Sequence, residues 1–315
     1  MSRMERAERL FLKFFAAPTN GAPAALFRVL LGLLACWQTV GVWLNLERFW
    51  GDKGLIPYAI VGGDKYQFLT PFFWVSESKG LLYGLAIAFT VSSVAILVGL
   101  YPRVFALVLA YVHLCFQYRN PFILNSGDRL FMIVAALAVA VPLGHRFSVD
   151  ALVRKLRKKP APPTPHVWGL RLLQIQVAYV YLNSTLAKLG NTRWRTGMAL
   201  RDVLASPVFA EWPTYVDFTP IIWFLTYSTL LFELAFPLLL WFRRPRRWLI
   251  AFGVLFHLGI DSTMLIPIFS YIMIVTYAAC LDDEDMAALG RFFSRLFRRA
   301  PAPVKSEEAA AAPGA

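Results

Sequence analysis

The chain has 315 residues, of which 58% are hydrophobic and only 16% are charged, and its formal net charge is +13. This composition excludes a disordered chain, and a mean hydropathy of +0.54 also excludes a basic, soluble nucleic-acid-binding protein. The three cysteines lie far apart in apolar segments, which excludes a disulfide scaffold and a CxxC site. We therefore predict an all-α fold, a polytopic integral membrane helical bundle.

The N-terminal segment, residues 1–20, is expected to stand apart from the transmembrane part, residues 21–285. Met4–Phe15 has the pattern of an amphipathic helix lying on the membrane, with arginines on one face. Its apolar run is too short for the core of a cleaved signal peptide.

Eight stretches of the chain approach the roughly 20 apolar residues that a membrane-crossing helix needs. The predicted spans are Ala25–Leu46, Lys79–Gly99, Val104–Gln117, Leu130–Leu143, Leu170–Ala187, Ile221–Phe242, Trp248–Ser262 and Pro267–Cys280. The last two come from one long apolar stretch, which we divide near Thr263–Pro267 because an even number of spans places all the basic segments on one side.

Lys and Arg gather in four segments: the N-terminus, the loop after the fourth span, the loop Arg243–Arg247 and the tail. The positive-inside rule assigns that side to the cytoplasm, so both termini are predicted to be cytoplasmic. The basic segments are expected to meet membrane lipids, not nucleic acid. Lys159–Pro165 is a Pro-rich cytoplasmic linker, and residues 286–315 are predicted to form a basic and then disordered tail, Ala/Pro-rich after Pro301.

Polar side chains inside or beside spans are candidates for function, because lipid makes them costly. The external loop that begins at Arg119 contains Asn125 and Asp128. It is either part of a binding site or a helix-capping turn with an Arg–Asp pair. Glu233 lies in the middle of the sixth span, where a carboxylate must pair or stay protonated, and a packing role is the plainer interpretation.

The fifth span is the most polar one. Gln176, Tyr179 and Asn183 share one helical face, and Lys188 follows at the external end. The polar side chains could also serve as ordinary interhelical hydrogen bonds, and Lys188 could simply snorkel to the interface. On the seventh span His257 and Asp261 are four residues apart, but no third ligand accompanies them, so no metal site is expected.

Tyr179–Gly197, which reads YVYLNSTLAKLGNTRWRTG, resembles the vitamin K-dependent gamma-carboxylase family and its HTTM (horizontally transferred transmembrane) domain, which bacterial proteins share. Arg119–Asp128 and His145–Leu152 (HRFSVDAL) resemble two further segments of these proteins. Phe256-His257 followed by Phe269-Ser270-Tyr271 is similar to a late carboxylase helix pair. The resemblance covers roughly residues 20–285.

The resemblance implies that Lys188 is the base that starts oxygenation of a reduced naphthoquinone or vitamin K-type quinol. A lysine base must be neutral, which burial favours. Where the carboxylases carry an assisting Asn-His pair, this chain has Ser126-Gly127, and the neighbouring Asp128 becomes the second catalytic candidate. The cofactor- or substrate-binding candidates are Arg119, Asn125, Gln176, Tyr179, Asn183, Trp194, His257 and Tyr271.

We therefore expect a gamma-carboxylase-like enzyme of the bacterial cytoplasmic membrane, with lyase or oxygenase chemistry, that modifies a substrate on the extracytoplasmic face. Its partners would be membrane lipids and a peptide substrate or a small redox or export protein. The alternative is a non-catalytic scaffold or maturation partner in a peptide or toxin export system. A transporter is disfavoured because no inverted repeat is visible.

Overall fold

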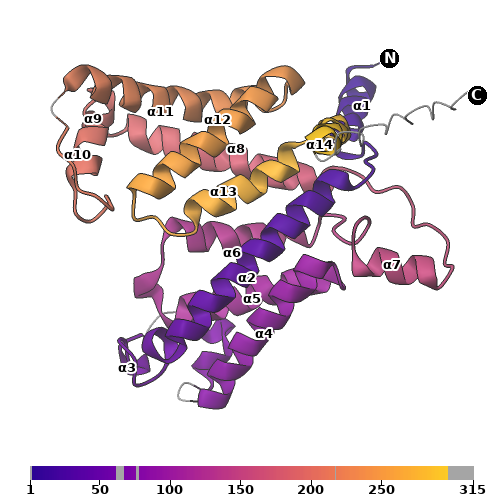
Figure 1. The fold of residues 1–315 in the computed structure, drawn as a ribbon, viewed down its shortest axis with the longest axis horizontal. Coiled ribbons are helices and arrows are strands. Elements are labelled where there is room, and N and C mark those ends of the chain that lie inside the picture. The colour runs from indigo at the N-terminus through magenta and orange to yellow at the C-terminus, as the bar shows by residue number, and fades with distance from the viewer. Residues whose placement is uncertain (1, 62–66, 76–77, 217, 297–315) are drawn as a thin grey trace, which may run out of the picture.

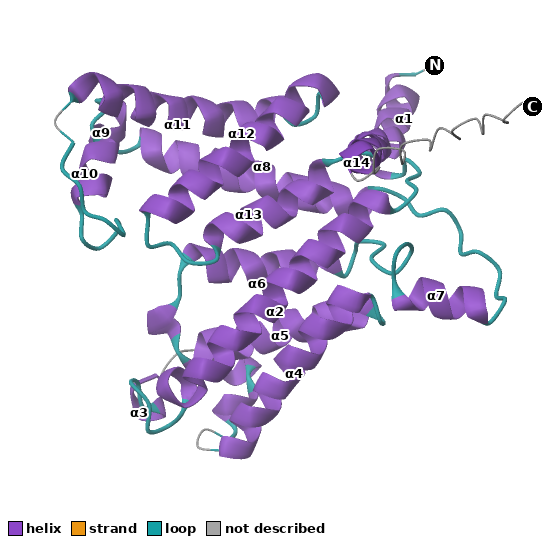
Figure 2. Cartoon of the chain, viewed as in Figure 1, coloured by secondary structure: helices purple, strands orange, loops and turns teal. Residues whose placement is uncertain are grey.

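A computed structural model describes residues 2–61, 67–75, 78–216 and 218–296. In these ranges the regular structure is helical throughout, and the extended contacts are two isolated bridges, Pro18–His166 and Ala210–Met264 (Figure 2). The all-α prediction is confirmed.

Each predicted span corresponds to a helix. These helices are α2 (Ala22–Trp50), α4 (Lys79–Val98), α5 (Pro102–Arg119), α6 (Ser126–Ala138), α8 (Trp168–Leu189), α11 (Thr219–Leu239), α12 (Arg243–Thr263) and α13 (Phe269–Tyr277), which continues into η4 (Ala278–Cys280). Proline in the first turn of α2, α5 and α11 favours their starts, and Gly99 ends α4 in the left-handed conformation. The largest difference from the prediction is α6, which begins and ends several residues earlier.

Among the described residues, α2, α4 and α11 are long and apolar enough to cross a membrane, and Phe269–Cys280 is a shorter apolar helix. Large apolar side chains on these helices, such as Leu44, Ile87 and Phe224, are exposed. An exposed apolar surface of this kind is typical of helices that face lipid. The chain is therefore an integral membrane protein built as a helical bundle.

The division of the last apolar stretch into two helices is confirmed. The backbone leaves the helical conformation at Met264, and Ile268 adopts a positive φ of 69°. Leu265 N donates to Phe209 O (2.8 Å), which holds the break against the preceding loop. The prediction that Arg243–Arg247 is a loop is wrong, because these residues form the first turns of α12. The side chains of Arg246 and Arg247 pair with Asp282 and Asp285.

Several short elements accompany the long helices. They are α1 (Arg3–Phe15), α3 (Tyr58–Val61), η1 (Gln67–Leu69), η2 (Pro71–Phe73), η3 (Pro121–Ile123), α7 (Val149–Leu156), α9 (Thr192–Arg195), α10 (Ala199–Ala205) and α14 (Asp283–Leu296). The α1 helix agrees with the predicted amphipathic segment and buries none of its residues. The first residues of the predicted tail belong to the α14 helix, whose first turn Arg246 and Arg247 hold through Asp285. The tail after Pro301 lies outside the described residues.

The α2 helix runs diagonally through the molecule, with α4, α5 and α6 on one side and α8, α11, α12 and α13 on the other (Figure 1). At Gly32 the backbones of α2 and α4 come so close that an added Cβ would lie 2.5 Å from Leu97 Cα. Figure 1 also shows α1, α7 and α14 at one end of the bundle and α3, α9 and α10 at the other. The basic segments thus gather at one end, and the C-terminus of α8 lies at the opposite end.

Candidate functional site

The buried face of α8 leads to Lys188. Gln174, Tyr181 and Thr185 are buried on this face, and Lys188 follows one turn later with 21% of its side chain exposed. Their spacing of three, four or seven residues keeps them in line along the helix. The inward face of α8 therefore carries polar side chains among apolar ones, and each buried polar group is costly in a membrane protein unless it has a partner.

Lys188 forms an ion pair with Glu233, which lies in the middle of α11 and whose side chain is only 5% exposed. The Lys188 ammonium also lies 4.7 Å from the centre of the Trp194 ring, in a cation–π contact. The second carboxylate oxygen, Glu233 Oε2, is buried and has no hydrogen-bond partner among the described residues. An unpaired acceptor beside a buried cation is a place where a hydroxyl group of a ligand could donate.

A second buried hydrogen-bonded group lies next to this pair. Tyr181 OH contacts His257 Nε2 at 2.9 Å and also bonds to Tyr277 OH, which joins α8, α12 and α13. His257 is 1% exposed, and its Nδ1 atom finds no partner within the described part of the chain. The rings of Phe232, Phe236 and Phe269 surround the group.

The two groups, Lys188 with Glu233 and Tyr181 with His257 and Tyr277, lie close together: Phe232, the neighbour of Glu233 on α11, packs against the Tyr181 ring at 5.4 Å between ring centres. We call the five residues of the two groups the Lys188 cluster. It lies between α8, α11, α12 and α13, within the half of the bundle that also carries α9 and α10 (Figure 1). Such a cluster can hold a proton at several positions and can bind a polar group inside an apolar wall.

Asp128 lies in a different setting. Its Oδ2 atom accepts hydrogen bonds from Asn125 N (3.1 Å) and Nδ2 (2.8 Å), and Asn125 Oδ1 accepts from Gly127 N, so the two residues form a capping box at the start of α6. The helix-capping interpretation of this loop is thus confirmed, but the Arg–Asp pair expected with it is not seen among the described residues, because Asn125 takes the Asp128 carboxylate locally. The structure shows no contact that joins Asp128 to the Lys188 cluster within the described ranges.

Arg119 instead holds the loop after α2. Its guanidinium is 1% exposed and donates to Gly51 O (2.9 Å) and Ile56 O (3.2 Å), and it lies 5.6 Å from the Tyr58 ring. These are charge-assisted bonds from a buried guanidinium to backbone carbonyls of that loop. The arrangement is that of a structural arginine.

Arg119→Met is therefore expected to lower the free energy of unfolding by about 2–3 kcal/mol, because the two charge-assisted hydrogen bonds to Gly51 O and Ile56 O are lost. Arg129→Met is the matched control, since Arg129 is exposed, and its effect should stay within about 0.5 kcal/mol. Unfolding in mixed micelles titrated with a denaturing detergent measures both values. Equal stabilities for the two variants would contradict this role of Arg119.

The remaining predicted binding residues lie in three different settings. Trp194 and His257 belong to or touch the Lys188 cluster. Tyr179 is 60% exposed, Asn183 is also exposed and Gln176 is half-buried, so the face they share points away from the cluster. Tyr271 donates to Asp261 Oδ2 (2.5 Å) and packs against Trp37 (5.2 Å between ring centres).

The sequence interpretation missed Tyr181, Tyr277 and Glu233 as site residues. Tyr181 lies seven residues before Lys188, so helical spacing alone places it on the face of the lysine. Glu233 stood out as a charge within an apolar span, but nothing in the sequence tells which residue pairs with it. Tyr277 depends on a glycine: a Cβ on Gly253 would lie 2.6 Å from Tyr277 OH, so only glycine leaves room for the tyrosine.

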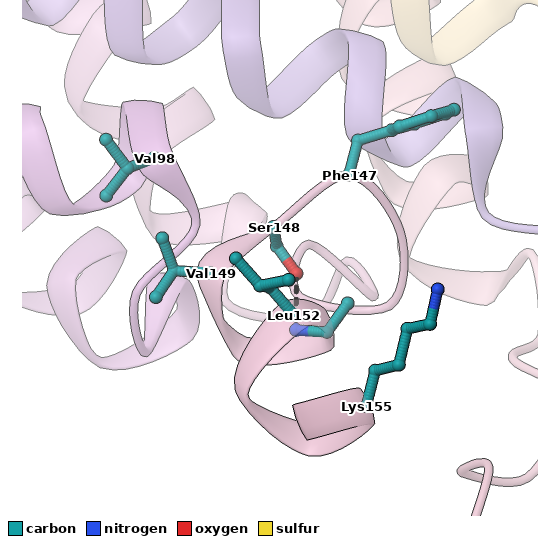
Figure 3. A pocket seen from close by; sticks show the side chains of 7 residues that line it. Val98, Phe147, Ser148, Val149, Leu152 and Lys155 are labelled. Carbon is teal, nitrogen blue, oxygen red and sulfur yellow. Dashed lines mark hydrogen bonds between the residues drawn. The ribbon is translucent and has the colours of Figure 1, made fainter. Parts of the chain in front are cut away.

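Two cavities lie away from these residues, both beside α7. One, of about 460 Å³, lies between the end of α4 and α7 and is lined by apolar side chains such as Val98 and Leu152, with Lys155 at its edge (Figure 3). The other, of about 530 Å³, is lined by Arg103, His145 and Arg154 among others. Neither includes a residue predicted to act in the site.

The model of the family described as HTTM domain matches residues 16–284 of the chain. This range contains every long helix and all five residues of the Lys188 cluster. No curated protein and no solved structure matches the chain.

Proposed function

Because the chain belongs to the HTTM domain family, we propose that it is a membrane enzyme whose Lys188–Glu233 pair accepts a proton from a quinol-type, lipid-soluble molecule. The observation that carries the proposal is this largely buried ion pair, which leaves Glu233 Oε2 without a hydrogen-bond partner among the described residues. The resemblance of the Lys188 segment to the gamma-carboxylases suggests the same role for the lysine.

The proposal places the eight long helices across the bacterial cytoplasmic membrane, with α1, α7 and α14 on the cytoplasmic side. The gathering of the basic segments at one end of the bundle supports this orientation, because Lys and Arg are retained in the cytoplasm. The Lys188 cluster then opens toward the extracytoplasmic face. The proposal keeps three parts of the chain: an interfacial segment (residues 1–20), a transmembrane domain (residues 21–285) and a tail (residues 286–315).

The residues present fit a reduced naphthoquinone-type quinol. Such a quinol, when bound, would supply an acidic hydroxyl and reducing electrons. Glu233 Oε2 and His257 Nδ1 are buried polar atoms without a hydrogen-bond partner among the described residues. A bound ligand could supply a partner for each. The Trp194 ring supplies an aromatic wall next to the lysine.

The Lys188–Glu233 pair can hold its shared proton either on the amine or on the carboxylate. When Lys188 Nζ passes its proton to Glu233 Oε1, the amine becomes free to accept another proton. The neutral amine then accepts a proton from a hydroxyl group, and Trp194 stabilises the ammonium that forms. Tyr181, His257 and Tyr277 form a hydrogen-bonded group of their own, with His257 Nδ1 left without a partner among the described residues. The proposal assigns no proton transfer to Asp128, because its Oδ2 atom caps α6.

The test is quinol-dependent oxygen uptake by the purified protein in lipid nanodiscs. The proposal predicts uptake above that of empty nanodiscs supplied with the same reduced naphthoquinone. A protein that takes up no oxygen and co-purifies stoichiometrically with a peptide or redox protein would support the scaffold hypothesis instead.

A further inference from the structure

The cavity of about 530 Å³ beside α7 has the chemistry of a site for an anionic group. Arg103 enters it from the start of α5 and Arg154 from α7, and His145 comes from the loop between α6 and α7. Arg103 uses only Nε for a backbone bond, to Val141 O (3.2 Å). The remaining guanidinium donors of two arginines from different helices match the oxygens of a phosphate.

One carboxylate also lines this cavity, but it is already engaged. Both oxygens of Asp150 accept from Tyr101 N, at 3.1 Å each, so Asp150 caps the start of α5. Burial, followed by the charges of Arg154 and Arg146, lowers the pKa of His145. Two arginines, Arg103 and Arg154, line the cavity together with one carboxylate, so the net charge of the lining is positive and an anion there would be stabilised.

The rim of the cavity is apolar. Val104 is 59% exposed and Tyr101 66%, and Trp168 at the start of α8 is also exposed. These side chains continue the apolar surface of α5 and α8 to the level of the arginines. Aromatic side chains next to basic ones at the ends of membrane helices are typical of the headgroup layer.

We infer that this cavity binds the phosphate of an anionic phospholipid, with the acyl chains along the apolar rim of α5 and α8. The inference goes beyond the proposed enzyme function, because the cavity lies at the end of the bundle opposite to α9 and α10 (Figure 1). A bound lipid would tie α7 to the start of α5 and so fix the loop between the two halves of the chain. A free phosphate shares the chemistry but would gain nothing from the apolar rim.

The test uses the full chain in detergent, with phosphatidylglycerol or phosphatidylcholine added and the bound lipids counted by native mass spectrometry. The wild type should retain phosphatidylglycerol in preference. Arg154→Gln and Arg103→Gln should each weaken that binding about fivefold. Arg157→Gln, an exposed arginine at the end of α7 that lines neither cavity, should change it little.

Thermal unfolding of each variant checks the fold, and Arg154→Lys, which keeps the charge, should retain most of the binding. Equal losses from Arg154→Gln and Arg157→Gln would overturn the inference, because they would indicate surface charge alone. Displacement of the lipid by inorganic phosphate would also overturn it, since the site would then bind a free anion.

Discussion

Lys188→Met is expected to lower quinol-dependent oxygen uptake by about 10²–10⁴-fold, which is the contribution of a positioned general base. Methionine keeps the length and apolar stem of the side chain but has no amine to accept a proton. The initial rate in nanodiscs, per folded protein, is the measurement. Lys188→Arg should lose as much activity, although it keeps the positive charge and the pairing with Glu233, because a guanidinium does not give up its proton.

Lys79→Met is the matched control for this experiment. Lys79 also pairs with a glutamate, Glu47, at 3.7 Å, but the two side chains are 77% and 45% exposed. Removing it should leave the rate unchanged. A Lys188→Arg variant with the wild-type rate would contradict a role for Lys188 as a base, because charge alone would then suffice.

The second large effect concerns stability. Lys188→Met leaves the Glu233 carboxylate buried without its cation, and we expect the free energy of unfolding to fall by about 3 kcal/mol. The double variant Lys188→Met/Glu233→Leu should recover most of that loss, since two apolar side chains replace a buried pair. Unfolding of the wild type, both single variants and the double variant gives the coupling energy between the two residues.

The exposed pair Lys79–Glu47 again supplies the control. Its coupling energy should be below about 1 kcal/mol, because water screens both charges. If the coupling of Lys188 with Glu233 were as small as that of the exposed pair, the two residues would not form a buried pair in the membrane.

The long helices could be predicted from the sequence because the signals are local. Apolar stretches, the prolines at helix starts and the break before Phe269 lie within one segment each. Short amphipathic helices were missed where charge runs are typical of loops, as in α7 and α14. Their helical form depends on caps such as Ser148, whose Oγ accepts from Ala151 N (3.1 Å).

The site was only partly predictable, because its partners come from different helices. The motif indicated Lys188, and helical spacing could have added Tyr181. Which face of α8 packs inward is decided by α11, so Tyr179 and Asn183 proved to lie on the exposed face. The Arg–Asp pair expected in the loop before α6 did not form, because the Asn125 side chain, three residues before Asp128, binds the carboxylate locally.

The location of a bound quinone tests the central claim most directly. A photoreactive naphthoquinone analogue is added to the purified protein in nanodiscs, and the labelled peptides are identified by mass spectrometry. The proposal predicts that the label falls on the peptide with Lys188 and Trp194 and that excess reduced naphthoquinone prevents it. Labelling confined to other helices, or labelling at Trp194 that excess quinol does not reduce, would contradict a quinol site at the Lys188 cluster.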